Sequence, residues 1–182
     1  MESGVSRKDA AVFIEQHYDA LKAMARSRRR RAQGPQGMLT TDILHEAWLK
    51  ISDREDWNDE AHFLASAAQA MRSVIVDHAR ATLAQKRGGG VRHALLDELQ
   101  EILADPSETP EDLLSISSLI DSLEKDHARA AKVVVLRYFG GFTDAEVAAI
   151  LGVSDRTIRS DWGFAKAWII DALECDLPTA LK

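Results

Sequence analysis

The 182-residue chain contains a single cysteine, Cys175, and therefore cannot form an internal disulfide. Its four prolines and ten glycines are too few for the many tight turns of a β-sandwich or β-barrel. The sequence has no run of about 18 apolar residues, so it predicts no membrane-spanning helix, and residues 1–10 lack the apolar stretch of a signal peptide. We therefore expect an all-α protein that stays in the cytoplasm.

Motifs of enzymes and of metal sites are also missing. The six histidines do not show HExxH or another metal-ligand spacing, and no nucleophile motif is present. Three consecutive glycines at 88–90 match neither phosphate-binding glycine pattern and follow no strand, so they predict a hinge. These absences argue against a helical enzyme, and we expect no metal and no cofactor.

Positive charge is absent from residues 93–124, which carry nine acidic residues and no Lys or Arg. The rest of the chain is nearly balanced: residues 1–92 carry 15 basic and 12 acidic residues, and residues 125–182 carry eight of each. The net charge of −6 therefore arises from one segment. Although DNA-binding domains are usually basic, this total does not exclude a nucleic-acid partner.

Apolar residues that recur every three to four positions predict helices over about residues 8–31, 40–51 and 60–86. The first of these ends in five arginines within residues 26–31, and two interpretations remain open for them. They either interact with the helix C-terminus and solvent, or they contact a phosphate backbone or an acidic partner.

Two prolines among acidic residues, Pro106 and Pro110, predict a linker between two helical bodies. Thr109 to Asp112 has the pattern of a helix cap and first turn, so the next helix begins there. We therefore expect two small helical domains, residues 8–86 and 111–178, joined by a flexible acidic linker at 87–110.

The strongest local pattern covers residues 143–170 and predicts a helix-turn-helix. Thr143 and Glu146 have capping-box spacing, Gly152 suits a tight turn, and Ala148 and Ile158 suit close crossing of two helices. Ser154 is placed to cap the second helix, whose first turns would meet base edges and phosphates. The predicted DNA-binding residues are Ser154, Asp155, Arg156, Thr157, Arg159 and Ser160, with the two arginines foremost. Apolar residues further along the helix are assigned to packing: Trp162, Phe164, Trp168 and Ile169.

Five segments, taken together and in order, resemble bacterial RNA polymerase sigma factors of the extracytoplasmic-function type: residues 45–50 (HEAWLK), 62–81, 85–90 (QKRGGG), 133–154 and 161–169. The resemblance implies a specificity subunit without catalytic activity. Its region 2 would bind a coiled coil of the polymerase β′ subunit and melt the −10 promoter element, and its region 4 would bind the β flap and read the −35 element.

The same resemblance implies residue roles in region 2. The core-binding helix would use Asp42, His45, Glu46, Trp48 and Leu49. Recognition of an unstacked −10 base and its backbone would use Trp57, Asn58, His62, Phe63, Arg72 and Arg80, because a flipped base needs an aromatic pocket and the adjacent phosphates need cations.

The resemblance also implies a role for the acidic segment at residues 93–124. The corresponding segment of sigma factors passes through the basic nucleic-acid channel of the polymerase. It would imitate a nucleic-acid strand there, and the alternative is a solvated, disordered linker.

Three departures from the family pattern concern charge. Relatives tend to have a basic residue at the position of Ser73 and more basic residues at 82–83, which suggests weaker backbone contact here. Relatives often carry arginine at the position of Gly163, so the −35 interaction should be modest. The third departure is the segment before the core-binding helix, which is acidic in many relatives but contains Thr40 and Thr41 here.

The two threonines permit two interpretations. A Ser/Thr kinase could phosphorylate Thr41, or alternatively Thr40, and restore negative charge at a helix N-terminus that favours anions. The other interpretation is that a threonine only caps the helix. The sequence shows no separate signature for binding an anti-sigma factor. It leaves three routes of control open, namely an anti-sigma factor, phosphorylation and the level of expression.

A different class of protein also fits the helix-turn-helix, namely a stand-alone dimeric repressor or activator. Such a protein would bind a palindromic site by itself. A sigma factor is instead expected to bind promoter DNA poorly alone and to initiate transcription with core polymerase.

Overall fold

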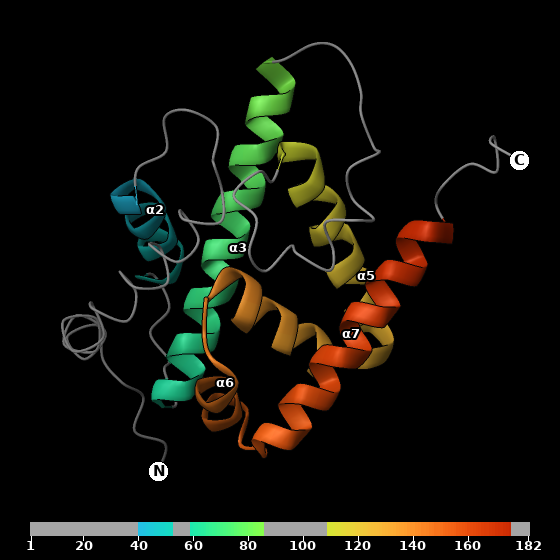
Figure 1. Cartoon of the computed structure of the whole chain (residues 1–182). Coiled ribbons are helices and arrows are strands. Elements are labelled where there is room, and N and C mark those ends of the chain that lie inside the picture. Colours follow the sequence, from blue (N-terminus) through green and yellow to red (C-terminus); the bar gives the residue numbers. More distant parts are fainter. Residues whose placement is uncertain (1–39, 53–58, 86–108, 176–182) are drawn as a thin grey trace, which may run out of the picture.

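The computed structural model describes residues 40–52, 59–85 and 109–175, and all regular structure in these ranges is helical (Figure 1). The prediction of an all-α protein is confirmed. The elements are α2 (Thr40–Ser52), α3 (Glu60–Gln85), α5 (Pro110–Val134), a π-helical segment η1 (Val135–Phe139), α6 (Asp144–Leu151) and α7 (Asp155–Cys175). The predicted helix over 8–31 and the glycine hinge at 88–90 lie outside the described residues.

Helix α2 packs on α3 through one apolar face. Ile43, Ala47 and Ile51, spaced by four residues, are buried in the core. On the edge of this contact, the Lys50 ammonium donates hydrogen bonds to Ser73 Oγ and Asp77 Oδ2 of α3, each over 2.7 Å. The pairing of α2 with α3 is thus both apolar and electrostatic.

Helix α5 begins at the cap predicted from the sequence. The Thr109 hydroxyl accepts from the Asp112 amide, and the Asp112 carboxylate accepts from the Thr109 amide, which forms a reciprocal capping box. The helix is kinked at His127, where φ is −135° and ψ is 57°. It continues into η1, where the Gly140 amide donates to the Val135 carbonyl, five residues earlier.

One apolar core includes residues from all these elements. Helix α3 lies at its centre, in contact with α2 on one side and with α5, η1 and α6 on the other (Figure 1). The N-terminal half, residues 40–52 and 59–85, therefore packs directly on the C-terminal half, residues 109–175. The domain boundaries given above stay a prediction, and the described parts of the two expected domains share this core.

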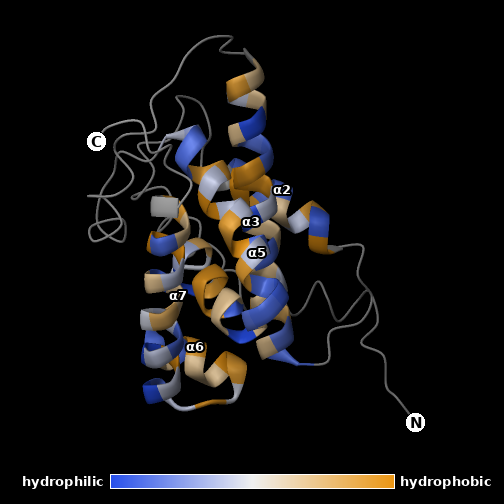
Figure 2. Ribbon diagram, turned by 90° about the vertical axis from the view of Figure 1, so that its right-hand side faces the viewer, coloured by the Kyte–Doolittle hydropathy of each residue, from blue (hydrophilic) through white to orange (hydrophobic). Residues whose placement is uncertain are grey.

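The outer helices α2 and α7 lie on opposite sides of α3 and α5 in both views (Figures 1 and 2). Figure 2 shows hydrophilic and hydrophobic residues alternating along α7, as expected of an amphipathic helix with one face on the core. Surfaces carried by α2 and by the start of α7 are therefore separate.

The contact between Lys50 and Asp77 generates a pH-dependent prediction. The hydrogen bond from Lys50 lowers the pKa of Asp77 below its ordinary value of 3.8; partial burial opposes this, and the charges of Lys50 and Arg80 add to the lowering. The side chains are 40% and 52% exposed. We therefore expect Asp77→Asn to lower the free energy of unfolding by only about 0.5 kcal/mol at neutral pH.

The direction of the pH dependence follows from the lowered pKa of Asp77. The stability contributed by Asp77 is complete above pH 3.8 and is lost as the pH falls through the lower pKa of the folded state. Urea denaturation of the wild type and of Asp77→Asn over a pH series measures this. A difference between the two proteins that stays constant into the acid range would contradict the assigned role of Lys50.

Candidate nucleic-acid interface

The first helix of the helix-turn-helix, α6, begins and ends as its sequence predicts. The Thr143 amide donates to Glu146 Oε2 over 2.7 Å, and the Glu146 amide donates to Thr143 Oγ1 over 3.4 Å. At its other end Gly152 has φ of 64°, the left-handed conformation that glycine adopts without steric cost. The capping box and the turn at Gly152 are confirmed.

The turn leads directly into α7. The Val153 amide donates to the Ala148 carbonyl over 3.0 Å, and Ser154 Oγ accepts from the Thr157 amide over 3.2 Å. Ala148 and Ile158, the residues expected at the helix crossing, are 5% and 0% exposed. The two helices are therefore held in the predicted arrangement by caps at the turn and by a small residue at the crossing.

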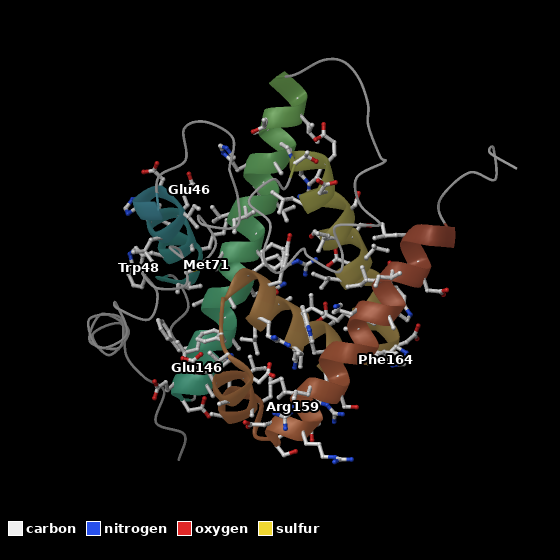
Figure 3. The ribbon with its side chains drawn as sticks, in the orientation of Figure 1. Glu46, Trp48, Met71, Glu146, Arg159 and Phe164 are labelled. Carbon is white, nitrogen blue, oxygen red and sulfur yellow. The ribbon has the colours of Figure 1, made fainter. Side chains whose placement is uncertain are left out.

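The first turns of α7 present an outer face of charged and polar side chains. Asp155, Arg156, Arg159 and Ser160 are exposed. Arg156 and Arg159 are three residues apart and so are neighbours on the helix surface, near a helix N-terminus that itself favours anions. Figure 3 shows Arg159 at the end of α7 nearest to α6.

Two of the six predicted DNA-binding residues have a structural role in this face. The hydroxyls of Ser154 and Thr157 are 2.9 Å apart and share a hydrogen bond, while Ser154 also caps α7. Contacts with DNA from all six residues remain predictions.

Arg137 contacts both helices of the helix-turn-helix, and the sequence analysis did not single it out. Its Nη1 lies 3.1 Å from Asp144 Oδ1 at the start of α6, and its guanidinium carbon lies 4.2 Å from the ring centre of Trp162 on α7. Burial lowers the pKa of Arg137, and the charge of Asp144 opposes this. One side chain of η1 thus contacts both helices of the helix-turn-helix. The available signal was a lone arginine within the apolar run from Val133 to Phe139.

One packing assignment on α7 is wrong. Ile169 is buried, and Trp162 and Trp168 are packed against the core, but Phe164 is 43% exposed. Its ring lies 4.6 Å from that of His127 at the kink of α5, in an edge-to-face arrangement. The buried face of α7 consists of Ile158, Ala165 and Ile169. Phe164 directly precedes Ala165 in the sequence and therefore points away from this face.

Helix α2 carries the residues predicted to bind core polymerase. Four of them are exposed: Asp42, His45, Glu46 and Leu49. The last three follow Asp42 by three, four and seven residues, so all four lie on one face of the helix. The opposite face carries the buried Ile43, Ala47 and Ile51. Leu49 is 53% exposed, whereas Trp48 is partly buried against the core. Figure 3 shows Glu46 and Trp48 on α2, and Met71 on the neighbouring α3. The helix begins at Thr40, and the side chains of Thr40 and Thr41 lie outside the described residues.

The residues predicted to contact the −10 element are not gathered on one exposed surface. Trp57 and Asn58 lie outside the described residues. Phe63 is 0% exposed and belongs to the core, so it cannot contact a DNA base in this conformation. His62 is half-buried, and its amide donates to Asp59 Oδ1 at the start of α3. Arg80 is exposed and lies 3.3 Å from Asp77.

Arg72 is the second member of this group that DNA cannot reach in this conformation. Its side chain is 5% exposed, and its Nη2 donates to Ser117 and Asp121 of α5. The partners lie more than 40 residues away in the sequence, so no local pattern indicated them.

Comparison with protein families identifies the chain. A family model described as ECF sigma factor matches residues 2–175, which is nearly the whole chain. The chain belongs to the ECF sigma factor family. As a sigma factor it takes part in transcription initiation, binding RNA polymerase and promoter DNA. Comparison with curated proteins and with solved structures gives no match.

The described residues of the sigma factor contain neither a candidate metal site nor a candidate membrane-spanning helix. Within residues 40–52, 59–85 and 109–175, no three His, Cys, Asp or Glu side chains come together in a group that could hold a metal ion. None of the helices described is long and apolar enough to cross a membrane.

Gly163 of α7 leads to a prediction about stability. It is exposed in α7, and a Cβ atom built on it would meet nothing within 4 Å. We therefore expect Gly163→Ala to raise the free energy of unfolding of the sigma factor by about 1 kcal/mol. Gly140→Ala is the contrasting variant, because its Cβ would lie 2.5 Å from the Leu136 carbonyl oxygen and 2.8 Å from the Phe142 ring. Urea denaturation should show a gain for the first and a loss for the second; a loss for both would mean that α7 needs glycine at 163.

Proposed function

We propose that this sigma factor binds core polymerase through the outer face of α2 and reads the −35 element through the first turns of α7. In this proposal residues 8–86 act as region 2, which binds the β′ coiled coil and melts the −10 element. Residues 111–178 act as region 4, which also binds the β flap. The observation that carries the proposal is the helix-turn-helix with Arg156 and Arg159 exposed at the start of its second helix, in a chain of this family.

The face of α2 has the composition of a protein-binding surface. Leu49 supplies exposed apolar area, and Glu46 and Asp42 supply negative charge about one and two turns before it, respectively. A partner with apolar side chains between basic residues complements such a face. This supports α2 as the contact with the polymerase.

The start of α7 has the composition of a DNA-reading surface. An arginine can donate two parallel hydrogen bonds to a guanine edge or to a phosphate, and Arg156 and Arg159 are exposed on the same side of the helix. Gly163, one turn further, offers no side chain to the DNA backbone, which supports a modest −35 contribution.

Run-off transcription with core polymerase and a promoter library tests the assignment. We expect Arg156→Ala and Arg159→Ala each to reduce initiation at promoters that carry the selected −35 element by about tenfold. Lys166→Ala removes a positive charge two turns further along α7 and serves as the matched control, with initiation near the wild-type level. If no form of the protein initiates transcription with core, while the protein alone protects a palindromic site, the stand-alone repressor replaces the sigma assignment.

Control by a kinase at the start of α2 is part of the same proposal. Asp42 is the acidic residue in the first turn of α2, which begins at Thr40. A phosphate on Thr41, or on Thr40, adds about 1.5 to 2 negative charges to a helix end that favours anions, directly before the proposed core-binding face. The competing role of the threonines as simple caps predicts no such dependence.

Core-binding measurements on threonine variants separate these roles. We expect Thr41→Glu to bind core about twofold to fivefold more tightly than Thr41→Ala, and the phosphorylated protein to bind more tightly still. Ser118→Glu adds the same charge at an exposed site of α5 and should leave the affinity unchanged. Equal affinity of the unmodified, phosphorylated, Ala and Glu forms would eliminate control at this position.

A further inference from the structure

Arg137 bridges the open side of the helix-turn-helix. The turn at Gly152 joins the end of α6 to the start of α7, so the chain connects the two helices at one corner (Figure 1). Asp144 precedes Gly152 by eight residues and Trp162 follows it by ten, so each lies about two turns away from that corner. Arg137 Nη1 lies 3.1 Å from Asp144 Oδ1, and the guanidinium carbon lies 4.2 Å from the ring centre of Trp162. One side chain therefore links the helices away from their turn.

The contact with Asp144 holds the start of α6. Asp144 Oδ1 is buried and accepts no hydrogen bond from the part of the chain that the structure describes. The charge of the nearby Arg137, whose side chain is 21% exposed, therefore compensates for the lost hydration of this oxygen. Removal of the guanidinium would leave a buried carboxylate oxygen without a positive partner, and the start of α6 could relieve that cost only by moving towards solvent.

The contact with Trp162 holds the rotation of α7 about its own axis. A planar guanidinium over an indole ring gains from both stacking and the attraction between the cation and the ring. Trp162 follows Arg156 by six residues and Arg159 by three on the same helix. The direction of the indole ring and the directions of these two arginines are therefore coupled through the helix backbone.

Arg137 itself extends from a rigid support. It is the one charged residue in the apolar run 133–139, and its neighbours Leu136 and Tyr138 are 2% and 3% exposed. The π-helical backbone of η1 is closed by the hydrogen bond from the Gly140 amide to the Val135 carbonyl. Such π-helical turns within helices are frequent at functional sites. The base of the Arg137 side chain is thus fixed by burial on either side.

We propose that Arg137 is a positioning residue for recognition of the −35 element, which fixes the angle between α6 and α7 and so aims Arg156 and Arg159 at the DNA. The inference rests on the proposed reading of the −35 element by the first turns of α7. Side chains that recognise a ligand need to be held within about 0.5 Å and 10–20° of their productive geometry. An arginine outside the reading face thereby controls recognition without contacting DNA.

Arg129 provides a matched control. Its Nε and Nη2 donate to the two carboxylate oxygens of Asp161, the residue directly before Trp162, over 2.6 and 3.1 Å. This ion pair joins α5 to α7 and does not involve α6. The Arg129 side chain is 57% exposed, and exposed ion pairs contribute little to stability. Arg129→Met therefore removes the same charge and a contact with α7, but not the bridge between the two helices.

The test uses the full chain with core polymerase and two promoters that share a −10 element. One promoter carries the selected −35 element and the other carries a scrambled one. We expect Arg137→Met to lower the ratio of run-off initiation at the first promoter to that at the second by about fivefold, with initiation at the scrambled promoter within about twofold of the wild type. Arg129→Met should keep the wild-type ratio within about twofold.

Arg137→Lys is the conservative variant. Its ammonium can pair with Asp144 but cannot lay a planar face on Trp162, so we expect it to recover only part of the ratio lost in Arg137→Met. Urea denaturation checks that each variant is folded. If Arg137→Met does not fold, the test is made with Arg137→Lys, and a ratio equal to that of the wild type would then refute the positioning role.

A combined variant distinguishes positioning from direct contact with DNA. When Arg156→Ala and Arg159→Ala are both present, the side chains that Arg137 positions are missing. We therefore expect Arg137→Met to cause no further change in the ratio in this background. A phosphate contact made by Arg137 itself would instead lower the ratio by the same factor again, because contacts that act independently are additive.

Three other results would overturn the positioning role: an unchanged ratio in Arg137→Met, an equal loss at both promoters, or an equal loss in Arg129→Met. The variants of Arg156 and Arg159 separate this failure from that of the proposed function. If they lower the ratio and Arg137→Met does not, only the role of Arg137 is refuted. If they also leave the ratio unchanged, the reading of the −35 element by α7 is refuted.

Discussion

The burial of α3 on more than one side is the constraint on which the rest of the structure depends. Phe63, Ala67, Met71 and Val74 are each at most 1% exposed, and Ile75 and Val76 on other sides of the same helix are also buried. A helix buried in this way needs neighbours in several directions, so α2 and the C-terminal half both pack against it. The outer face of α2 and the start of α7 owe their separation to this arrangement, because α3 lies between them.

Features built from neighbouring residues could be predicted from the sequence. The capping boxes at Thr109 and Thr143, the left-handed Gly152 and the cap at Ser154 each depend on atoms within three or four residues. Their chemistry is complete in a short stretch of chain. For this reason the helix-turn-helix was predicted with its turn and caps in the right places.

Features built from distant residues could not be predicted in this way. Arg72 was expected to face DNA because it is a cation at a family position, but its environment is set by Ser117 and Asp121, which belong to another helix. Phe164 was expected in the core because helical periodicity does not fix which of two adjacent residues faces inward. Arg137 was missed because its partners, Asp144 and Trp162, meet it only after η1, α6 and α7 have packed together.

The contact between Lys50 and Ser73 changes how one departure from the family pattern is understood. The resemblance to the family leads us to expect a basic residue at position 73, and the ammonium of Lys50 lies 2.7 Å from the hydroxyl of Ser73, 23 positions away in the chain. A positive charge is therefore present at that place on α3, although it is shared with Asp77. A comparison made one sequence position at a time finds no cation at position 73, whereas in the folded chain a lysine of α2 places one beside that position of α3.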